Sequence, residues 1–185
     1  SAFKSILARG MRLLQDIFPL PMARILMYDS PEWFIFGLIE GRQIIRQNRI
    51  DVIFSTYSPS TSHFIASVLQ KQTGLPWIAD YRDLWSTSGY VEQVEPLSTI
   101  ERWLERNTVQ NAIALTSVSK TLVDELGTFH SKEAVLITNG YDEEDYSYDV
   151  PVIKKFTITY TGEIYPGKRD PTPLFKAVAK LKNEG

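Results

Sequence analysis

The stretch that decides the fold is Asp51–Trp85, which reads DVIFSTYSPSTSHFIASVLQKQTGLPWIADYRDLW. Residues 51–56 are a short apolar run that ends in a polar turn, which predicts a buried strand. Residues 62–73 carry apolar side chains at helical spacing, and Gly74 marks the end of that helix. A second apolar run at 76–80 predicts another strand. Strand, helix and strand with short connections favour a parallel sheet.

The same alternation of helix and strand continues on both sides of this stretch. The further elements predicted are helix 31–46, helix 97–110 with Ile100, Trp103 and Leu104 facing inward, strand 112–116, a helix capped by Ser119, and strand 134–138. This order predicts the α/β class, with a Rossmann-like parallel sheet and helices on both faces.

The two ends of the chain add separate segments. Residues 2–18 have the spacing of an amphipathic helix with basic residues, which either packs on the core or contacts anionic lipid. Strand 156–161 and a helix at 171–183 predict one βα unit of a second domain. We therefore expect a first domain at 1–141, a linker at 142–155, and the start of a second domain at 156–185.

Composition excludes several classes of function. The chain has 185 residues, of which 43% are hydrophobic and 23% are charged, and its net charge is −2. Nucleic-acid binding proteins usually carry an excess of basic residues, so this charge balance argues against that function. There is no cysteine and there are two histidines, which argues against disulfides, a cysteine nucleophile and a metal site. No apolar run is long enough to span a bilayer. We expect a cytoplasmic protein that contacts a membrane only peripherally, without a cofactor.

Polar residues follow each predicted strand. In open parallel sheets, ligands bind beyond the carboxyl ends of the strands. The loops that hold this position are Ser55–Ser62, Asp80–Gly89, Thr116–Ser119 and Thr138–Tyr141, and the second domain adds Gly162–Asp170.

The loop after strand 76–80 carries the most charge. Asp80, Arg82 and Asp83 follow directly on an apolar strand, and charges in that position need partners. One interpretation is a structural Asp–Arg pair that fixes the loop, and the other is a polar cluster that lines an active site. Two carboxylates separated by Tyr and Arg are not a recognisable site for a divalent ion.

The other loops offer hydroxyls and cations. Ser58, Thr61 and Ser62 lie at a helix start, where they either cap the helix or bind a sugar or an anion. His63 reads as a structural helix residue. In the loop Gly162–Asp170, glycines, cations and a helix start together suit a diphosphate, whereas the alternative is a solvated turn.

Taken in order, these segments resemble one family. The stretch Asp51–Trp85, with its Asp-x-Arg-Asp-x-Trp segment, resembles the acceptor-domain core of bacterial group 1 glycosyltransferases of the family 4-like kind. ERWLERNTVQNAIALTSVSKTLVDEL is similar to the helix, strand and helix that follow there. VLITNGYDEEDY resembles their Asn-Gly-x-Asp segment, and FTITYTGEIYPGKRDPTPLFKAVAKL the opening of their donor domain. The resemblance covers residues 29–185.

The resemblance implies a GT-B enzyme with two Rossmann-like domains. It would move a sugar from a nucleotide diphosphate to an acceptor hydroxyl, with retention and without a required metal, in cell-surface polysaccharide synthesis on a lipid-linked or saccharide acceptor. The residues it assigns are Asp80, Arg82 and Asp83 near the transferred sugar, Ser58, Thr61 and Ser62 on the acceptor side, and Asn139, Gly162, Lys168 and Arg169 on the donor side. Many members carry a histidine where this chain has Arg82.

Two expectations concern the extent of the chain. The family's first strand and the glutamate pair of its donor domain are not found in these residues, so we expect a fragment that is inactive alone. Strand 156–161 would then lack its sheet, and we expect residues 156–185 either to be mobile or to pair with an edge of the first domain or with another copy of the chain. The competing hypothesis is a non-catalytic α/β module that binds a sugar or a nucleotide. A hydrolase is disfavoured because no Gly-x-Ser-x-Gly motif occurs.

Overall fold

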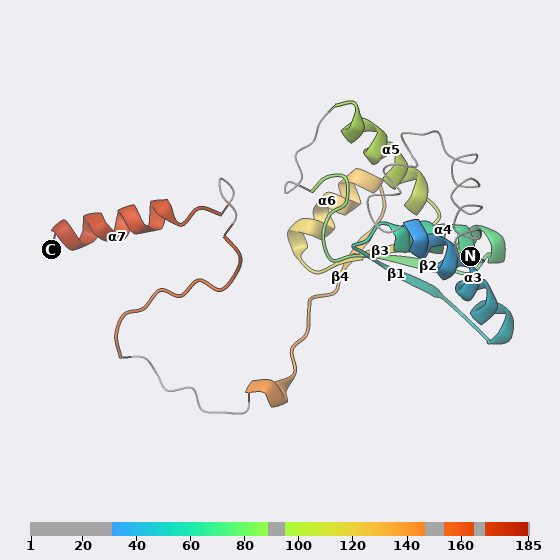
Figure 1. The fold of residues 1–185 in the computed structure, drawn as a ribbon, viewed down its shortest axis with the longest axis horizontal. Helices are drawn as coiled ribbons and strands as arrows, with labels where there is room; N and C mark the ends of the chain where they lie inside the picture. The colour runs from blue at the N-terminus through green and yellow to red at the C-terminus, as the bar shows by residue number, and fades with distance from the viewer. Residues whose placement is uncertain (1–30, 89–94, 147–153, 165–168, 185) are drawn as a thin grey trace, which may run out of the picture. The chain divides into compact units, whose positions relative to one another are not determined.

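The computed structural model of the chain describes residues 31–88, 95–146, 154–164 and 169–184 (Figure 1). The chain divides into two units, Ser1–Tyr141 and Asp142–Gly185, and each is described by itself. The predicted helix 2–18 lies outside the described residues.

The first unit is built on a parallel sheet of four strands. These are β1 (Ile53–Tyr57), β2 (Trp77–Tyr81), β3 (Ala114–Ser117) and β4 (Ala134–Leu136), and they lie side by side in the order in which they occur in the chain. The α/β class with a Rossmann-like parallel sheet flanked by helices is therefore confirmed.

Four helices accompany this sheet within the described part of the first unit. They are α3 (Pro31–Gln47), α4 (Thr61–Thr73), α5 (Leu97–Val109) and α6 (Lys120–His130). Helix α4 packs on β1 and β2, α6 packs on β3 and β4, and both α3 and α5 contact α4. The predicted boundaries of these helices agree with the structure to within a few residues.

The helix ends follow from local chemistry. Helix α4 ends at Gly74, whose φ of 70° places it in the left-handed region that glycine adopts without strain. Helix α6 begins at Ser119, whose hydroxyl accepts a hydrogen bond from the Leu122 amide at 3.4 Å. The Lys132 ammonium donates to three backbone carbonyls at the end of α5, those of Val109, Gln110 and Ala112.

Alternate residues of the strands form the core. Trp77, Ala79 and Tyr81 of β2 are fully buried on one face of the sheet. His63 of α4 and His130 of α6 both contact the Tyr81 ring, with centroid separations of 4.9 Å and 5.9 Å. Helices α4 and α6 therefore lie on this same face.

The inward face of α5 differs from the prediction. Trp103, which was expected to face inward, is 54% exposed, and Ile100 is half-buried. Leu104 is buried as expected, and beside it Glu105 is completely buried. The apolar pattern alone misplaces this face because the Glu105 carboxylate has hydrogen-bonding partners inside the protein, whereas the Trp103 ring projects from the outer side of the helix.

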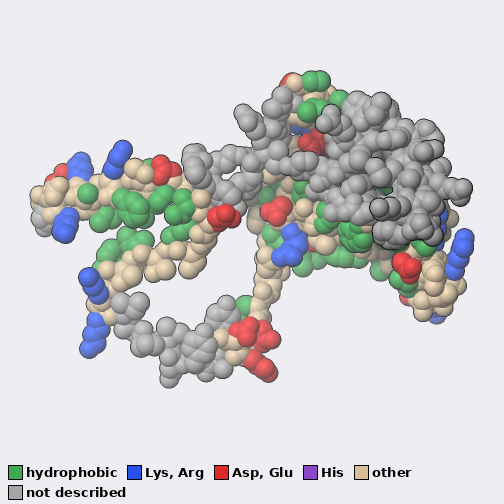
Figure 2. All heavy atoms as spheres, in the orientation of Figure 1, with side chains coloured by type: hydrophobic (Ala, Val, Ile, Leu, Met, Phe, Trp, Pro, Cys, Tyr) green, Lys and Arg blue, Asp and Glu red, His purple; other side chains and the backbone are tan. Residues whose placement is uncertain are grey.

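The second unit has little internal packing among its described residues. It contains a short 3₁₀ helix, η1 (Glu143–Tyr146), and helix α7 (Thr172–Glu184), which confirms the predicted terminal helix. The Asp170 carboxylate accepts from the Thr172 amide at 2.9 Å and caps that helix, as the sequence predicts. Apolar side chains line α7 (Figure 2), and Phe175 among them is 64% exposed.

The strand predicted at 156–161 is not formed in the structure. These residues belong to no sheet, and Phe156 is 88% exposed. A strand is stable only within a hydrogen-bonded ladder. The described residues supply no partner strand in this unit, so the alternation of Phe156, Ile158 and Tyr160 with threonines does not by itself produce a strand.

Candidate functional site

The loops of interest leave the sheet at one edge. Tyr57, Tyr81 and Ser117 are paired with one another across β1, β2 and β3, and each is the last residue of its strand. The segments that follow these three residues therefore emerge together, at the carboxyl end of the sheet, where ligands bind in this class of fold.

Asp80 joins three strands. It occupies one cross-strand row with Thr56 and Thr116, whose hydroxyls donate to its two carboxylate oxygens. The Thr56 hydroxyl lies 2.8 Å from Oδ2, and the Thr116 hydroxyl lies 2.5 Å from Oδ1. Because both oxygens accept hydrogen bonds from the sheet, Asp80 is an anchor at the base of the loop that follows it.

Arg82 and Asp83 follow β2 and are exposed. Neither makes a hydrogen bond or an ion pair with any residue in the part of the chain that the structure describes. The predicted structural Asp–Arg pair is therefore wrong for this conformation. Hydroxyls of the neighbouring strands satisfy Asp80 instead, and an exposed Arg–Asp contact would contribute little stability.

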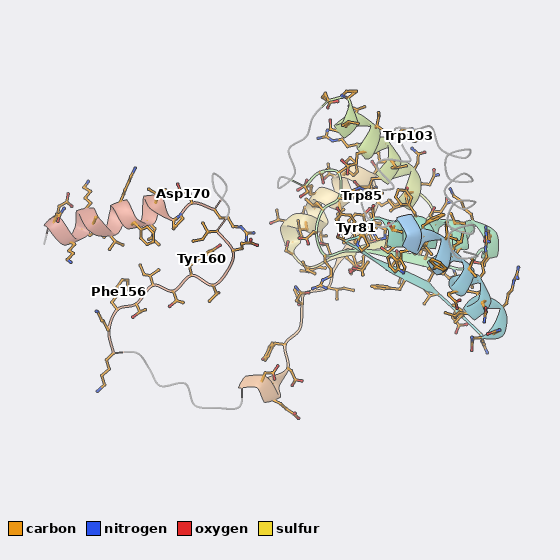
Figure 3. The ribbon with its side chains drawn as sticks, viewed as in Figure 1. Tyr81, Trp85, Trp103, Phe156, Tyr160 and Asp170 are labelled. Carbon is orange, nitrogen blue, oxygen red and sulfur yellow. The ribbon has the colours of Figure 1, made fainter. Side chains whose placement is uncertain are left out.

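The loop that follows β2 is also fixed just beyond Arg82 and Asp83. The Trp85 side chain, labelled in Figure 3, is buried. Its ring stacks on the Tyr57 ring at a centroid distance of 5.9 Å and an interplanar angle of 14°. Its Nε1 donates to Glu101 Oε1 of α5 at 3.1 Å. The next residue, Ser86, donates to Glu105 from its backbone amide at 2.8 Å and from its hydroxyl.

The hydroxyls of the first loop divide into two groups. Ser58 is exposed. Thr61 is buried, and the Ser62 hydroxyl donates to the backbone carbonyls of Thr56 and Pro59 at the start of α4. Of the three residues assigned to the acceptor side, Ser58 is thus the one that this conformation presents to solvent.

A serine and a histidine lie within hydrogen-bonding distance beneath this loop. Ser55 Oγ is 2.8 Å from His63 Nδ1 and accepts from Trp77 Nε1 at 2.8 Å. Both side chains are buried, and His63 is completely so. Burial, followed by the charge of His130, lowers the pKa of His63 to about 3. This pair is inaccessible to a substrate, which agrees with the interpretation of His63 as a structural residue.

The residues assigned to the donor side belong to both units. Asn139 is exposed beyond β4 in the first unit. Gly162, with a φ of 152°, and Arg169 are exposed in the second unit, and Lys168 lies outside the described residues. The structure therefore brings together the loops of β1 and β2, whereas the residues assigned to the donor side are divided between the two units. Within the described ranges, no group of three potential ligand side chains is placed to hold a metal ion.

Comparison with known families adds the deciding observation. The sequence profile of the glycosyl transferase 4-like domain matches residues 9–140. The chain belongs to this family. A search of curated proteins gives no match. As a glycosyl transferase 4-like domain, the first unit is part of a glycosyltransferase of the GT-B type, and the match includes β1 to β4 and the Arg82–Asp83 loop.

Sequence reasoning missed four residues that shape this site. Glu101 and Glu105 lie one helical turn apart on α5 and hold the loop, and Thr56 and Thr116 hold Asp80. The threonines gave a usable signal, since each is the last residue of its predicted strand, at 51–56 and at 112–116. The glutamates gave none, because a Glu on a charged helix is ordinarily exposed.

Proposed function

We propose that the protein transfers a sugar from a nucleotide-diphosphate donor to an acceptor hydroxyl, with retention of configuration. In this reaction the bond between the sugar carbon and the diphosphate oxygen breaks, a bond to the acceptor oxygen forms, and the acceptor proton leaves. The diphosphate gains negative charge in the transition state. A cation placed near it, and acceptors for the sugar hydroxyls, are therefore the groups that would promote the step.

The observation that carries this proposal is the placement of Arg82 and Asp83. They are exposed at the carboxyl end of the sheet, in a loop fixed on one side by Asp80 and on the other by Trp85. Charged side chains that form no hydrogen bond or ion pair with the described residues, on a fixed loop at the ligand-binding edge, are available to a substrate. We assign Arg82 to the leaving diphosphate and Asp83 to a hydroxyl of the sugar or of the acceptor.

The remaining assignments extend the same proposal. Ser58 faces the acceptor, and Asn139, Gly162, Lys168 and Arg169 contribute to donor binding. We propose an acceptor that is lipid-linked or a saccharide, a role in cell-surface polysaccharide synthesis, and a cytoplasmic site of action with peripheral membrane contact. The structure contributes one fact here, namely that none of the described helices is long and apolar enough to cross a membrane.

The test uses the full-length protein and the variants Arg82→Ala and Asp83→Asn. Each variant should lower turnover by about tenfold or more, since each removes a proposed contact to the substrate. The melting temperature should stay within about 2 °C of the wild type, because both side chains are exposed. Arg46→Ala, which removes an exposed arginine from α3, is the matched control. Wild-type turnover in either variant would refute the assignment of these two residues.

Donor binding is tested separately. Replacing Lys168 and Arg169 by alanine should weaken nucleotide-sugar binding in calorimetry, since a hydrogen bond to a charged group contributes about 1.5–3 kcal/mol. An unchanged affinity would remove both residues from the donor site. A wild-type protein that binds the donor but transfers no sugar would instead support a non-catalytic binding module.

A further inference from the structure

Glu105 is a carboxylate buried in the first unit, with a side chain that is 1% exposed. Removing a charge from water is costly, so such a group needs several polar partners. Its Oε2 accepts from the backbone amide and the hydroxyl of Ser86, and its Oε1 lies 3.1 Å from Nε2 of His130. Burial, reinforced by the charge of Glu105, raises the pKa of the nearby Tyr81 hydroxyl well above its usual value.

The partner Ser86 belongs to the loop that carries Arg82 and Asp83. Trp85, the residue before it, donates to Glu101, which precedes Glu105 by one turn of α5. The Trp85 ring also meets Phe64 of α4 edge to face, at a centroid distance of 5.4 Å. Helix α5 therefore holds the loop at Trp85 and Ser86 through two carboxylates. The rings of Tyr57 and Phe64 also pack against Trp85.

The near end of the loop is fixed by the sheet. The Tyr81 carbonyl accepts from the Ser117 hydroxyl at 2.6 Å, and Asp80 accepts from threonines on both neighbouring strands. Only three residues, 82–84, separate this anchor from Trp85. The direction in which Arg82 and Asp83 project is thus set by both anchors, and the second of them depends on Glu105.

We propose that Glu105 is a positioning residue for Arg82 and Asp83, and that it acts through Ser86. This inference rests on the proposed function, in which those two residues contact the substrate. A side chain that served only to fill the core would be apolar, since an apolar residue of similar volume avoids the desolvation of a carboxylate. Glu105 instead accepts the amide and the hydroxyl of a loop residue, which fixes the loop backbone at that point.

Three variants separate positioning from packing. Glu105→Leu keeps the volume but removes the carboxylate that accepts from the Ser86 amide and hydroxyl. Glu105→Gln keeps an acceptor oxygen and is the conservative variant. Ser86→Ala removes one of the two hydrogen bonds and leaves the core intact. Glu133→Gln, an exposed glutamate before β4, is the control for loss of a negative charge.

The first measurement is amide hydrogen exchange and ¹⁵N relaxation at residues 82–86. In Glu105→Leu the Ser86 amide should exchange about tenfold faster or more, and the amides of Arg82 and Asp83 should gain fast motion. Glu105→Gln should remain close to the wild type in both respects. Equal exchange and relaxation in the wild type and in Glu105→Leu would overturn the proposal.

The second measurement is steady-state transfer by the full-length protein. Glu105→Leu should lower kcat about tenfold or more with little change in KM, since a displaced Arg82–Asp83 pair weakens the transition state more than substrate binding. Glu105→Gln should restore most of that loss. Equal loss in both variants, or a change confined to KM, would contradict positioning.

Two further outcomes are a Glu105→Leu variant that does not fold and a wild-type protein that transfers no sugar. If Glu105→Leu does not fold, Ser86→Ala decides the question: faster motion at residues 82–84 with a kcat reduced about threefold supports the proposal, and wild-type behaviour in both measurements overturns it. If the wild-type protein transfers no sugar, the proposed function fails. The exchange and relaxation measurements then still show whether Glu105 holds residues 82–84 in place.

Discussion

His63 makes the stability of the first unit sensitive to acid. Its side chain is completely buried, and its pKa is lowered from 6.5 to about 3. In the unfolded chain the same histidine has an ordinary pKa, so between these two values the unfolded state binds a proton that the folded state does not. The contribution of His63 is therefore fully present above pH 6.5 and is lost as the pH falls toward 3.

The size of this loss follows from the two pKa values. One pKa unit corresponds to about 1.36 kcal/mol, so between pH 7.5 and 4.5 His63 should lower the free energy of unfolding by about 2–3 kcal/mol. Carboxylates also titrate in this range, but a variant without the histidine retains them. His63→Gln keeps a side chain that can hydrogen-bond to the Ser55 hydroxyl and removes the titrating ring.

The assay is urea unfolding followed by tryptophan fluorescence at several pH values. All four tryptophans lie in the first unit, so the signal reports that unit alone. The wild type should be more stable than His63→Gln at pH 7.5, and this difference should shrink by about 2–3 kcal/mol at pH 4.5. Parallel curves for the two proteins across this range would refute the argument that His63 is neutral and buried in the folded state.

Three further predictions concern stability measured by the same assay. Lys132→Met should cost about 1–3 kcal/mol, because three carbonyls at the end of α5 lose a charged donor, and a neutral effect would contradict the cap. Gly74→Ala should cost about 1 kcal/mol, since alanine is strained at a φ of 70°, and a stabilised variant would be inconsistent with this cap. Thr116→Val should cost about 1–3 kcal/mol by leaving Asp80 Oδ1 without a donor, whereas wild-type stability would show that this bond is dispensable.

The sequence was informative where local chemistry decides the structure. Strands β1 to β3 were recognised from short apolar runs, and the end of α4 from Gly74. The start of α6 followed from Ser119, and that of α7 from Asp170. In each case a backbone conformation or a cap depends on residues close together in the chain, so a local pattern is sufficient.

The sequence was insufficient where the structure depends on contacts between residues that are far apart in the chain. The burial of Glu105 and the exposure of Trp103 depend on Ser86 and His130, which no pattern on α5 reveals. The partners of Asp80 come from two other strands, so the charge of the neighbouring arginine was a misleading guide. The alternation at residues 156–161 predicts a strand only if a ladder is available, and the described residues supply none.

The order of the strands has a consequence for how the first unit forms during synthesis. Among the described residues, each strand from β2 to β4 pairs with the strand made immediately before it, and none of them is inserted between two others. On the ribosome, every strand after β1 therefore meets an existing edge as soon as it emerges, and the β1–α4–β2 unit can assemble before the rest of the chain has been made. Arrested chains that are long enough for Tyr81 to have emerged from the ribosome should already protect α4 from protease.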